Sequence, residues 1–238
     1  MKKIWILTLF PEYFTPFFEK GVSSRIKNYC EIHIISLRDY GLGLHKSVDD
    51  HPYGKGEGTL LRIDVLDKAI LDIIKKANAS LADFTMICPT ARGKVFNTVT
   101  AKEISQKLIT ETDKNILFLC GRYEGFDQRL FDLYSISEIN VGDFVLTGGE
   151  LPVMTILDAS LRFIPGLLGN NKSSQQDSFE EGLLEQPQYT RPANYKGLEV
   201  PAILLSGHTK NIEDYQREER KRVTQVLRPD LLKKKVKE

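Results

Sequence analysis

Cysteine, histidine and long apolar runs are all scarce in this sequence, and each scarcity excludes a class of protein. There are three cysteines among 238 residues, an odd number without a Cys-x-x-Cys pair, so we expect Cys30, Cys88 and Cys120 to be free, mostly buried thiols in a reducing compartment. The four histidines lack metal-ligand spacing, which argues against a zinc site. No apolar run reaches the roughly 18 residues that a membrane span needs, so we expect no membrane partner.

Two common nucleotide-binding signatures are absent as well. A phosphate loop requires Gly-x-x-x-x-Gly-Lys followed by Ser or Thr, which does not occur. A dinucleotide fold, or the common methyltransferase fold, has a glycine cluster directly after its first strand. Here the apolar run Lys3–Phe10 continues into "PEYF". That run is short and lacks a small-residue cleavage site, so it predicts a first strand rather than a signal peptide, and a cytoplasmic protein.

The composition itself describes an ordinary globular chain. Hydrophobic residues make up 41% of it, enough for one substantial core or a core with a small appendage. The net charge of +1 excludes a globally basic nucleic-acid binder but allows a local basic surface. Residues 208–238 carry ten Lys/Arg against six Asp/Glu, a local charge of about +4. Composition alone favours a solvated helix there, and an RNA-phosphate face is the alternative.

Short apolar runs alternate with helical patterns through the first two thirds of the chain. Apolar residues recur at helical spacing from Val65 to Ile74, "TAKE" at Thr100–Glu103 suggests a capping box, and Leu151–Phe163 predicts a largely apolar helix. The expected strands are Lys3–Phe10, Glu31–Leu37, Phe84–Pro89, Ile116–Cys120 and Ser137–Leu146. This alternation predicts an α/β fold with a mainly parallel sheet.

The alternation stops at a polar stretch without periodicity, Gly166–Gln176. Such a composition is typical of a mobile linker. We therefore expect a first domain over residues 1–163, a flexible linker over 164–177 and a smaller helical domain over 178–238.

Four loops at predicted strand ends concentrate glycine, proline and charge. Any one of them could be a plain turn. Together they favour a binding site built largely from backbone, which suits an adenine and a ribose read by amide and carbonyl groups. The loops are "VDDHPYGKGEG" (48–58), "PTARGK" (89–94), "CGRYEGFDQR" (120–129) and "INVGDFVLTGGELP" (139–152).

Five motifs together resemble the bacterial tRNA (guanine-N1)-methyltransferase family, in its order and over nearly the whole chain. They are "DDHPYGKGEG", "CGRYEGFDQR", "VGDFVLTGGELP", "RFIPGLLG" and "DSFEEGLLEQPQYTRP". The resemblance implies the trefoil-knotted SPOUT fold and methyl transfer from S-adenosylmethionine to N1 of guanosine 37 in tRNA, inside the anticodon stem-loop. It also implies a homodimer with its active site at the subunit interface, and a C-terminal domain that binds tRNA.

The resemblance assigns the glycine loops to the cofactor, which explains why no phosphate-binding lysine follows them, since S-adenosylmethionine carries no phosphate. Simple packing is the alternative reading for Leu146 and Pro152. The implied cofactor residues are Pro89, Gly121, Tyr123, Glu124, Gly125, Val141, Gly142, Asp143, Phe144, Val145, Leu146, Gly148, Gly149 and Pro152.

The resemblance also names two catalytic residues. Guanine N1 carries a proton that a base must remove, and charge then develops on O6. Asp177 matches the family's general base, although an aspartate there is also a favoured helix N-cap. Arg162 matches the family's catalytic arginine, which is suited to stabilise the negative charge on O6, although it could instead pair with Asp158 on the same helix. Glu124 is a candidate Mg²⁺ ligand, with an ordinary surface carboxylate as its alternative.

The target base must be flipped out of the anticodon loop to reach such a pocket. By resemblance, Asp49 and Asp50 lie near the substrate guanosine, while Arg25, Lys55 and the C-terminal basic residues are candidate phosphate contacts.

The sequence departs from the family pattern in several places. Lys55 interrupts a run of three glycines, Thr59 and Phe144 stand where Met and Tyr are usual, and Tyr215 replaces a Trp. Two alternatives remain: a non-catalytic RNA-binding module of this fold, and a SPOUT methyltransferase for a different RNA position. The presence of both Arg162 and Asp177 argues against the first. The aspartate at the linker end and the motif "DSFEEGLLEQPQYTRP", which the resemblance assigns to the guanine-N1 branch, argue against the second.

Overall fold

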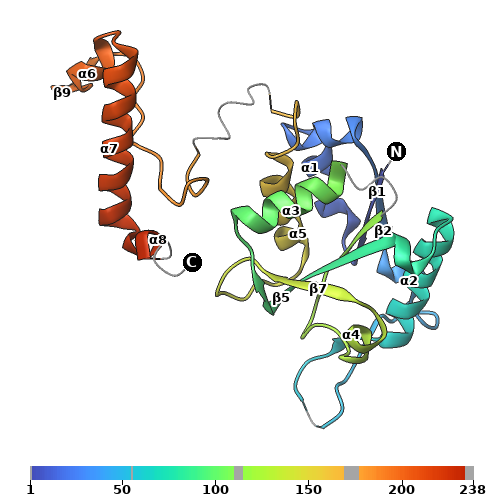
Figure 1. Cartoon of the computed structure of the whole chain (residues 1–238). Coiled ribbons are helices and arrows are strands. Elements are labelled where there is room, and N and C mark those ends of the chain that lie inside the picture. Colours follow the sequence, from blue (N-terminus) through green and yellow to red (C-terminus); the bar gives the residue numbers. More distant parts are fainter. Residues whose placement is uncertain (1, 55, 110–114, 169–176, 234–238) are drawn as a thin grey trace. The chain divides into compact units, whose positions relative to one another are not determined.

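The chain forms two compact units, Met1–Gly169 and Asn170–Glu238. The structure, a computed structural model, describes residues 2–54, 56–109, 115–168 and 177–233 (Figure 1). No helix within these described ranges is long and apolar enough to cross a membrane.

A five-stranded sheet forms the centre of the first unit. Its strand order is β2-β1-β6-β5-β7, and every ladder between neighbours is parallel. The predicted α/β fold with a mainly parallel sheet is therefore confirmed, whereas the knot stays a prediction. The strands are β1 (Lys2–Thr8), β2 (Cys30–Ser36), β5 (Phe84–Val95), β6 (Asn115–Leu119) and β7 (Ile136–Asn140).

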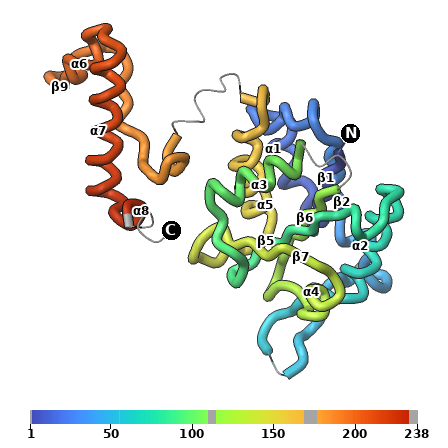
Figure 2. Tube along the Cα trace, in the orientation of Figure 1, coloured from blue at the N-terminus to red at the C-terminus, as the bar shows by residue number. Residues whose placement is uncertain are grey.

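Helices cover both faces of this sheet (Figures 1 and 2). Successive side chains of a strand point to opposite faces, so Ile4 and Ile6 of β1 join one hydrophobic cluster while Trp5 and Leu7 join the other. The first cluster includes side chains of α1 (Thr15–Glu19), α3 (Thr98–Ile109) and α5 (Glu150–Leu161), and the second includes those of α2 (Ile63–Ala77) and α4 (Arg129–Leu133). Both faces are thus buried, as parallel sheets require.

Short elements join these layers. A small antiparallel hairpin pairs β3 with β4 and precedes α2. The hairpin strands are β3 (Asp49–Asp50) and β4 (Leu60–Leu61), and the 3₁₀ helices are η1 (Pro11–Tyr13), η2 (Ser23–Asn28), η3 (Leu37–Tyr40) and η4 (Leu81–Asp83).

Helix α2 follows directly from its sequence pattern. Val65, Leu66, Ala69, Ile70 and Ile73 recur on one face, and all are buried. Such a stripe places the apolar face of a surface helix on the core. The predicted helix is therefore confirmed.

Two predicted boundaries are wrong. Thr100 does not begin a capping box, because it lies inside α3 and its amide donates to Oδ1 of Asn97 at 3.1 Å, so Asn97 caps the helix. The predicted strand Ser137–Leu146 ends at Asn140. There the Asn140 side-chain oxygen accepts the amide of Gly142 at 2.8 Å, which turns the chain out of the sheet.

The predicted linker begins too early. Leu167 is buried in the first hydrophobic cluster, and its carbonyl accepts a hydrogen bond from Arg25 Nη1 at 2.9 Å. Residues up to Leu168 thus pack within the first unit, and the rest of the predicted linker, residues 169–176, lies outside the described residues.

The three cysteines are free and buried, as expected. Burial raises the pKa of the Cys30 thiol to about 11 and that of Cys88 further still. These thiols therefore stay protonated and unreactive at neutral pH.

The second unit packs an irregular segment against one long helix. Thr224 of α7 is fully buried, and its hydroxyl accepts the amide of Leu184 at 2.8 Å. Arg220, one turn earlier, forms an ion pair with Glu181 at 2.8 Å. These contacts hold the segment that follows Asp177. The elements of this unit are β8 (Asn194–Tyr195), β9 (Leu198–Glu199), α6 (Ala202–Leu205), α7 (Thr209–Leu227) and α8 (Pro229–Lys233).

We predict that Phe118→Ala destabilises the first unit strongly. Phe118 in β6 is completely buried, and truncation of a buried phenylalanine costs about 3–5 kcal/mol. Urea unfolding followed by circular dichroism measures the change. Leu133→Ala is the control, because that side chain is exposed and its loss should cost less than about 0.5 kcal/mol. Equal effects of the two substitutions would contradict the packing described above.

Candidate functional site

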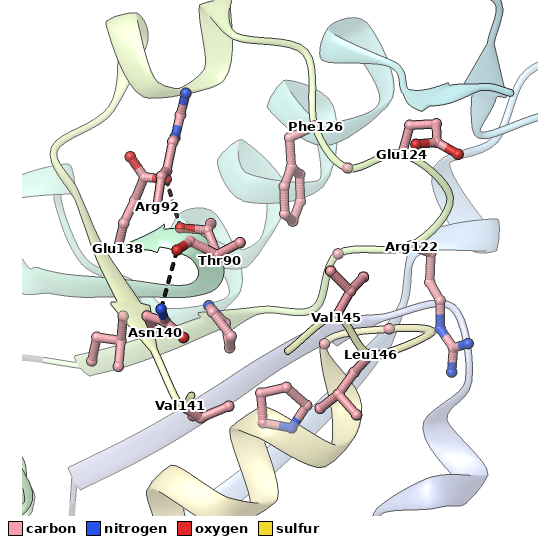
Figure 3. A pocket seen from close by; sticks show the side chains of 18 of the residues that line it. Thr90, Arg92, Arg122, Glu124, Phe126, Glu138, Asn140, Val141, Val145 and Leu146 are labelled. Carbon is pink, nitrogen blue, oxygen red and sulfur yellow. Dashed lines mark hydrogen bonds and ion pairs between the residues drawn. The ribbon is translucent and has the colours of Figure 1, made fainter. Parts of the chain in front are cut away.

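A cavity of about 400 Å³ opens where β6 and β7 end and β5 bulges. The carboxyl edge of a parallel sheet is where open α/β folds bind ligands, and the volume is in the range of small-molecule sites. Three loops and the start of α5 line it (Figure 3).

Most of the predicted cofactor residues gather in this one cavity. Gly142 and Asp143 are not among the lining residues but belong to the loop that supplies several of them. The predicted residues that line the cavity are Pro89, Gly121, Tyr123, Glu124, Gly125, Val141, Phe144, Val145, Leu146, Gly148, Gly149 and Pro152.

Two glycines bring the loops closer together than other residues would allow. The amide of Gly149 donates to the carbonyl of Gly121 at 2.8 Å, and a Cβ added at Gly149 would lie 2.6 Å from the Gly121 nitrogen. A Cβ at Gly148 would overlap the side chain of Arg122. Glycine is therefore needed at position 149 for the approach of two backbones and at position 148 to leave room for the Arg122 side chain, rather than for unusual torsion angles.

A buried ion pair lies beneath these loops. Arg122 Nη2 is 2.8 Å from Glu150 Oε2, and the Glu150 side chain is only 1% exposed. The other carboxylate oxygen accepts the Thr8 hydroxyl at 2.7 Å. Burial lowers the pKa of Arg122, but the hydrogen bond and charge of Glu150 outweigh it, so the pKa is raised. Arg122 is therefore held as a cation.

The Arg122 side chain also spans the space between loops. Its Nη1 donates to the carbonyl of Thr147 at 3.2 Å. Its guanidinium lies 4.5 Å from the ring centroid of Phe10 and 5.5 Å from that of Tyr13, within the range of cation–π attraction. One side chain thus contacts the segment after β1 and the loop before α5.

A second cluster forms the opposite wall and was missed at the sequence level. Glu138 Oε2 accepts the Thr90 hydroxyl at 2.9 Å and Arg92 Nε at 2.7 Å, as Figure 3 illustrates. Arg92 also donates to Gln128 at 2.8 Å and lies over the ring of Phe131. The hydrogen bond that Arg92 donates to Glu138 raises the pKa of Arg92. The loop "PTARGK" was singled out in the sequence and contains Thr90 and Arg92. Their partners, Glu138 and Gln128, come from distant segments of the chain.

The β3–β4 hairpin is attached to the cavity through its backbone. The amide of Glu124 donates to the carbonyl of Thr59 at 3.0 Å, and the amide of Leu61 donates to the carbonyl of Gly125 at 2.8 Å. Within the hairpin, Asp50 forms an ion pair with Arg62 at 2.7 Å. The predicted substrate-side residues Asp49 and Asp50 therefore lie on a segment joined directly to the Glu124 loop.

The remaining predicted residues come from other parts of the chain. Arg162 is the C-cap residue of α5, and twelve helical residues separate it from Gly149 by about 18 Å. Asp177 belongs to the second unit, where its carbonyl accepts the amide of Glu180 at 3.3 Å in a turn rather than at an α-helix. Arg25 binds the Leu167 carbonyl, and Lys55 lies outside the described residues.

The chain is similar over nearly its whole length to proteins of one known family. Residues 1–234 match the family described as tRNA (Guanine-1)-methyltransferase TrmD. The chain is 42% identical over 231 residues to a tRNA (guanine-N(1)-)-methyltransferase of Clostridioides difficile (strain 630), covering 96% of each protein. It is 40% identical over 235 residues to a protein of the same name from Bacillus cereus (strain AH820), covering 98% of this chain and 93% of the relative.

We predict that Gly149→Ala weakens binding of S-adenosylmethionine in this cavity. The added methyl group must push apart the Gly121 and Gly149 loops, and such overpacking costs about 1–3 kcal/mol, so affinity should fall roughly tenfold. Isothermal titration calorimetry measures the change. Thr155→Ala, an exposed change on the same helix, is the control and should leave affinity unaltered. Wild-type affinity in Gly149→Ala would show that the loop spacing does not govern the cavity.

Proposed function

The chain belongs to the tRNA (guanine-1)-methyltransferase family, and on that premise we propose that it transfers a methyl group from S-adenosylmethionine to N1 of guanosine 37 in tRNA. The observation that carries the proposal is the match over residues 1–234 combined with one cavity that collects the glycine loops at the sheet edge. A tRNA substrate also implies a cytoplasmic protein.

The residues of the cavity fit a nucleoside cofactor without phosphate. Its wall offers peptide groups at Gly121, Gly125 and Gly149, and apolar surface at Leu146 and Pro152. These suit a ribose and an adenine, which need close backbone donors and acceptors between apolar faces. Gly121, Tyr123, Glu124, Gly125, Val141, Phe144, Val145, Leu146, Gly148, Gly149, Pro152 and Pro89 would hold the cofactor.

S-adenosylmethionine, when bound, supplies an electrophilic methyl group on a sulfonium that is its own leaving group. The chain must then make guanine N1 nucleophilic. Asp177 is proposed to take the N1 proton, and Arg162 to donate hydrogen bonds to O6 as negative charge develops there. A site closed to water favours this step, because opposite charges cancel during transfer.

The β3–β4 hairpin is proposed to bind the nucleotides around the flipped guanosine. Asp49 and Asp50 lie on this hairpin, and the Arg62 guanidinium fixes the Asp50 carboxylate. Arg25, Lys55 and the basic residues of the C-terminal helices are proposed phosphate contacts. Arg25 retains an exposed side chain while bonded to Leu167, so both roles are compatible.

The described residues that line the cavity do not form a Mg²⁺ site. Glu124 and Glu138 are the two carboxylates among the lining residues, and Glu138 is engaged by Thr90 and Arg92. In the parts of the chain that the structure describes, no group of three His, Cys, Asp or Glu side chains is placed to hold a metal ion. No step of the reaction above is therefore assigned to a metal ion.

A homodimer with its active site at the interface is the proposed assembly. Within one chain, Arg162 and the Gly148–Gly149 loop stand at opposite ends of α5, too far apart to act on one guanine. In a dimer, Arg162 of a second copy would act on the guanine that lies at the cavity of the first. The exposed apolar side chains Phe144 and Val145 at the rim of the cavity offer surface for such a contact.

We predict that the purified protein methylates a tRNA transcript with guanosine at positions 36 and 37, and not one with adenosine at 37. Asp177→Ala should lower the rate by about 10²–10⁴-fold, the usual contribution of a general base. Incorporation of labelled methyl groups measures both. Methylation of both transcripts would mean a different target base, and full activity of Asp177→Ala would exclude it as the base.

We predict that two inactive variants restore activity when paired. A dimer of one Arg162→Ala chain and one Gly148→Val chain contains one cavity facing an intact arginine, so it should recover about half of the wild-type rate. Each variant alone should be inactive. Differently tagged chains, co-expressed and purified in tandem, provide the mixed dimer. An inactive mixed dimer would place Arg162 and the cavity of the same chain in one site.

A further inference from the structure

The Arg122–Glu150 pair is an unexpected feature of an otherwise apolar region. Glu150 is among the most buried residues of the chain, although it begins a helix next to the cavity. Ions are costly to remove from water, and a buried ion pair is often no more stabilising than apolar side chains of similar volume. Stability alone therefore does not account for these two charges.

We propose that Arg122 and Glu150 are a positioning pair that holds two walls of the cofactor cavity at a fixed separation. This inference rests on the proposed function in that it takes S-adenosylmethionine as the ligand. Neither charged group needs to contact the cofactor for this role. Arg122 comes just before Tyr123 and Glu124 in one wall, and its side chain reaches into the other.

The contacts of Arg122 tie the second wall to the first. Its guanidinium donates to the Thr147 carbonyl and is paired with Glu150 on either side of the Gly148–Gly149 turn. The turn is therefore held at both ends by one planar group. A lysine could not do this, because a single ammonium lacks the rigid fork of guanidinium donors.

Glu150 is itself fixed by the strand below. Thr8, the last residue of β1, donates its hydroxyl to Glu150 Oε1 at 2.7 Å, and the same hydroxyl oxygen accepts the amide of Phe10 at 3.0 Å. The ring of Phe10 lies against the guanidinium. Through Thr8 and Phe10, the pair thus connects both loops to the end of strand β1. Supporting contacts of this kind hold the residues of a site in place.

The test separates positioning from stability. Arg122→Met/Glu150→Gln removes both charges at nearly constant volume and keeps a partner for Thr8. We expect its melting temperature to remain within about 4 °C of wild type, because no ion is left unpaired. Its affinity for S-adenosylmethionine, measured by calorimetry, should fall about tenfold or more, since small misplacements of binding groups are costly.

Two further variants make the result decisive. Arg122→Lys keeps a positive charge opposite Glu150 but loses the forked set of guanidinium donors, so its affinity for S-adenosylmethionine should also fall. This variant replaces the double variant in the test if the double variant does not fold. Arg129→Met removes an arginine from an exposed pair with Asp127 and should bind as wild type does. Wild-type affinity in either Arg122 variant would overturn the proposal.

A readout without ligand separates this inference from the proposed function. In the unliganded protein, the amides of residues 147–149 should exchange hydrogen faster in the Arg122 variants than in wild type, with no change in β6. Unchanged exchange would overturn the positioning role. Failure of the wild-type protein to bind S-adenosylmethionine would instead overturn the proposed cofactor, and the exchange experiment would still decide whether the pair orders the loop.

Discussion

The candidate site depends on one close contact between two loops, in which the backbone of Gly149 rests on the backbone of Gly121. The amide–carbonyl bond of 2.8 Å requires that Gly149 carry no side chain, because a Cβ there would lie 2.6 Å from the Gly121 nitrogen. It connects the end of β6 with the start of α5, so the cavity lies between segments that the sheet itself holds in place. Peptide groups, rather than long side chains, form the centre of the wall, and their positions vary little because the backbone is hydrogen-bonded on both sides.

Charge is then arranged around this backbone contact in two separate clusters. Arg122 and Glu150 lie beneath the Gly148–Gly149 turn, while Arg92 and Glu138 form the opposite wall. The first pair is shielded from water, and the second is more exposed. Exposed pairs contribute little to stability and are weakened by salt. The cavity thus has one charge pair that is shielded from water and one that salt can weaken.

The sequence predicted the elements of the fold better than their ends. The apolar stripe of α2 and the alternation of short apolar runs with helical patterns are local features, and they predicted the α/β fold with its mainly parallel sheet. The end of β7 was missed because it depends on the single side chain of Asn140. The glycine loops of the cavity were found from their composition and from family resemblance.

The pairing of Arg122 with Glu150, and of Arg92 with Glu138, joins segments far apart in the chain, so no spacing in the sequence reveals it. Nor does the sequence show that Leu167 belongs to the core, because a polar stretch follows it.

The attachment of the β3–β4 hairpin has a consequence for how this protein can vary. The bonds from Glu124 to Thr59 and from Leu61 to Gly125 use only main-chain atoms. Every amino acid except proline supplies the same donor, and all supply the same acceptor. Thr59, which stands where the family usually has methionine, can therefore differ without detaching the hairpin. Substitution of these side chains leaves the main-chain bonds in place, so the hairpin can change its surface and remain joined to the cavity.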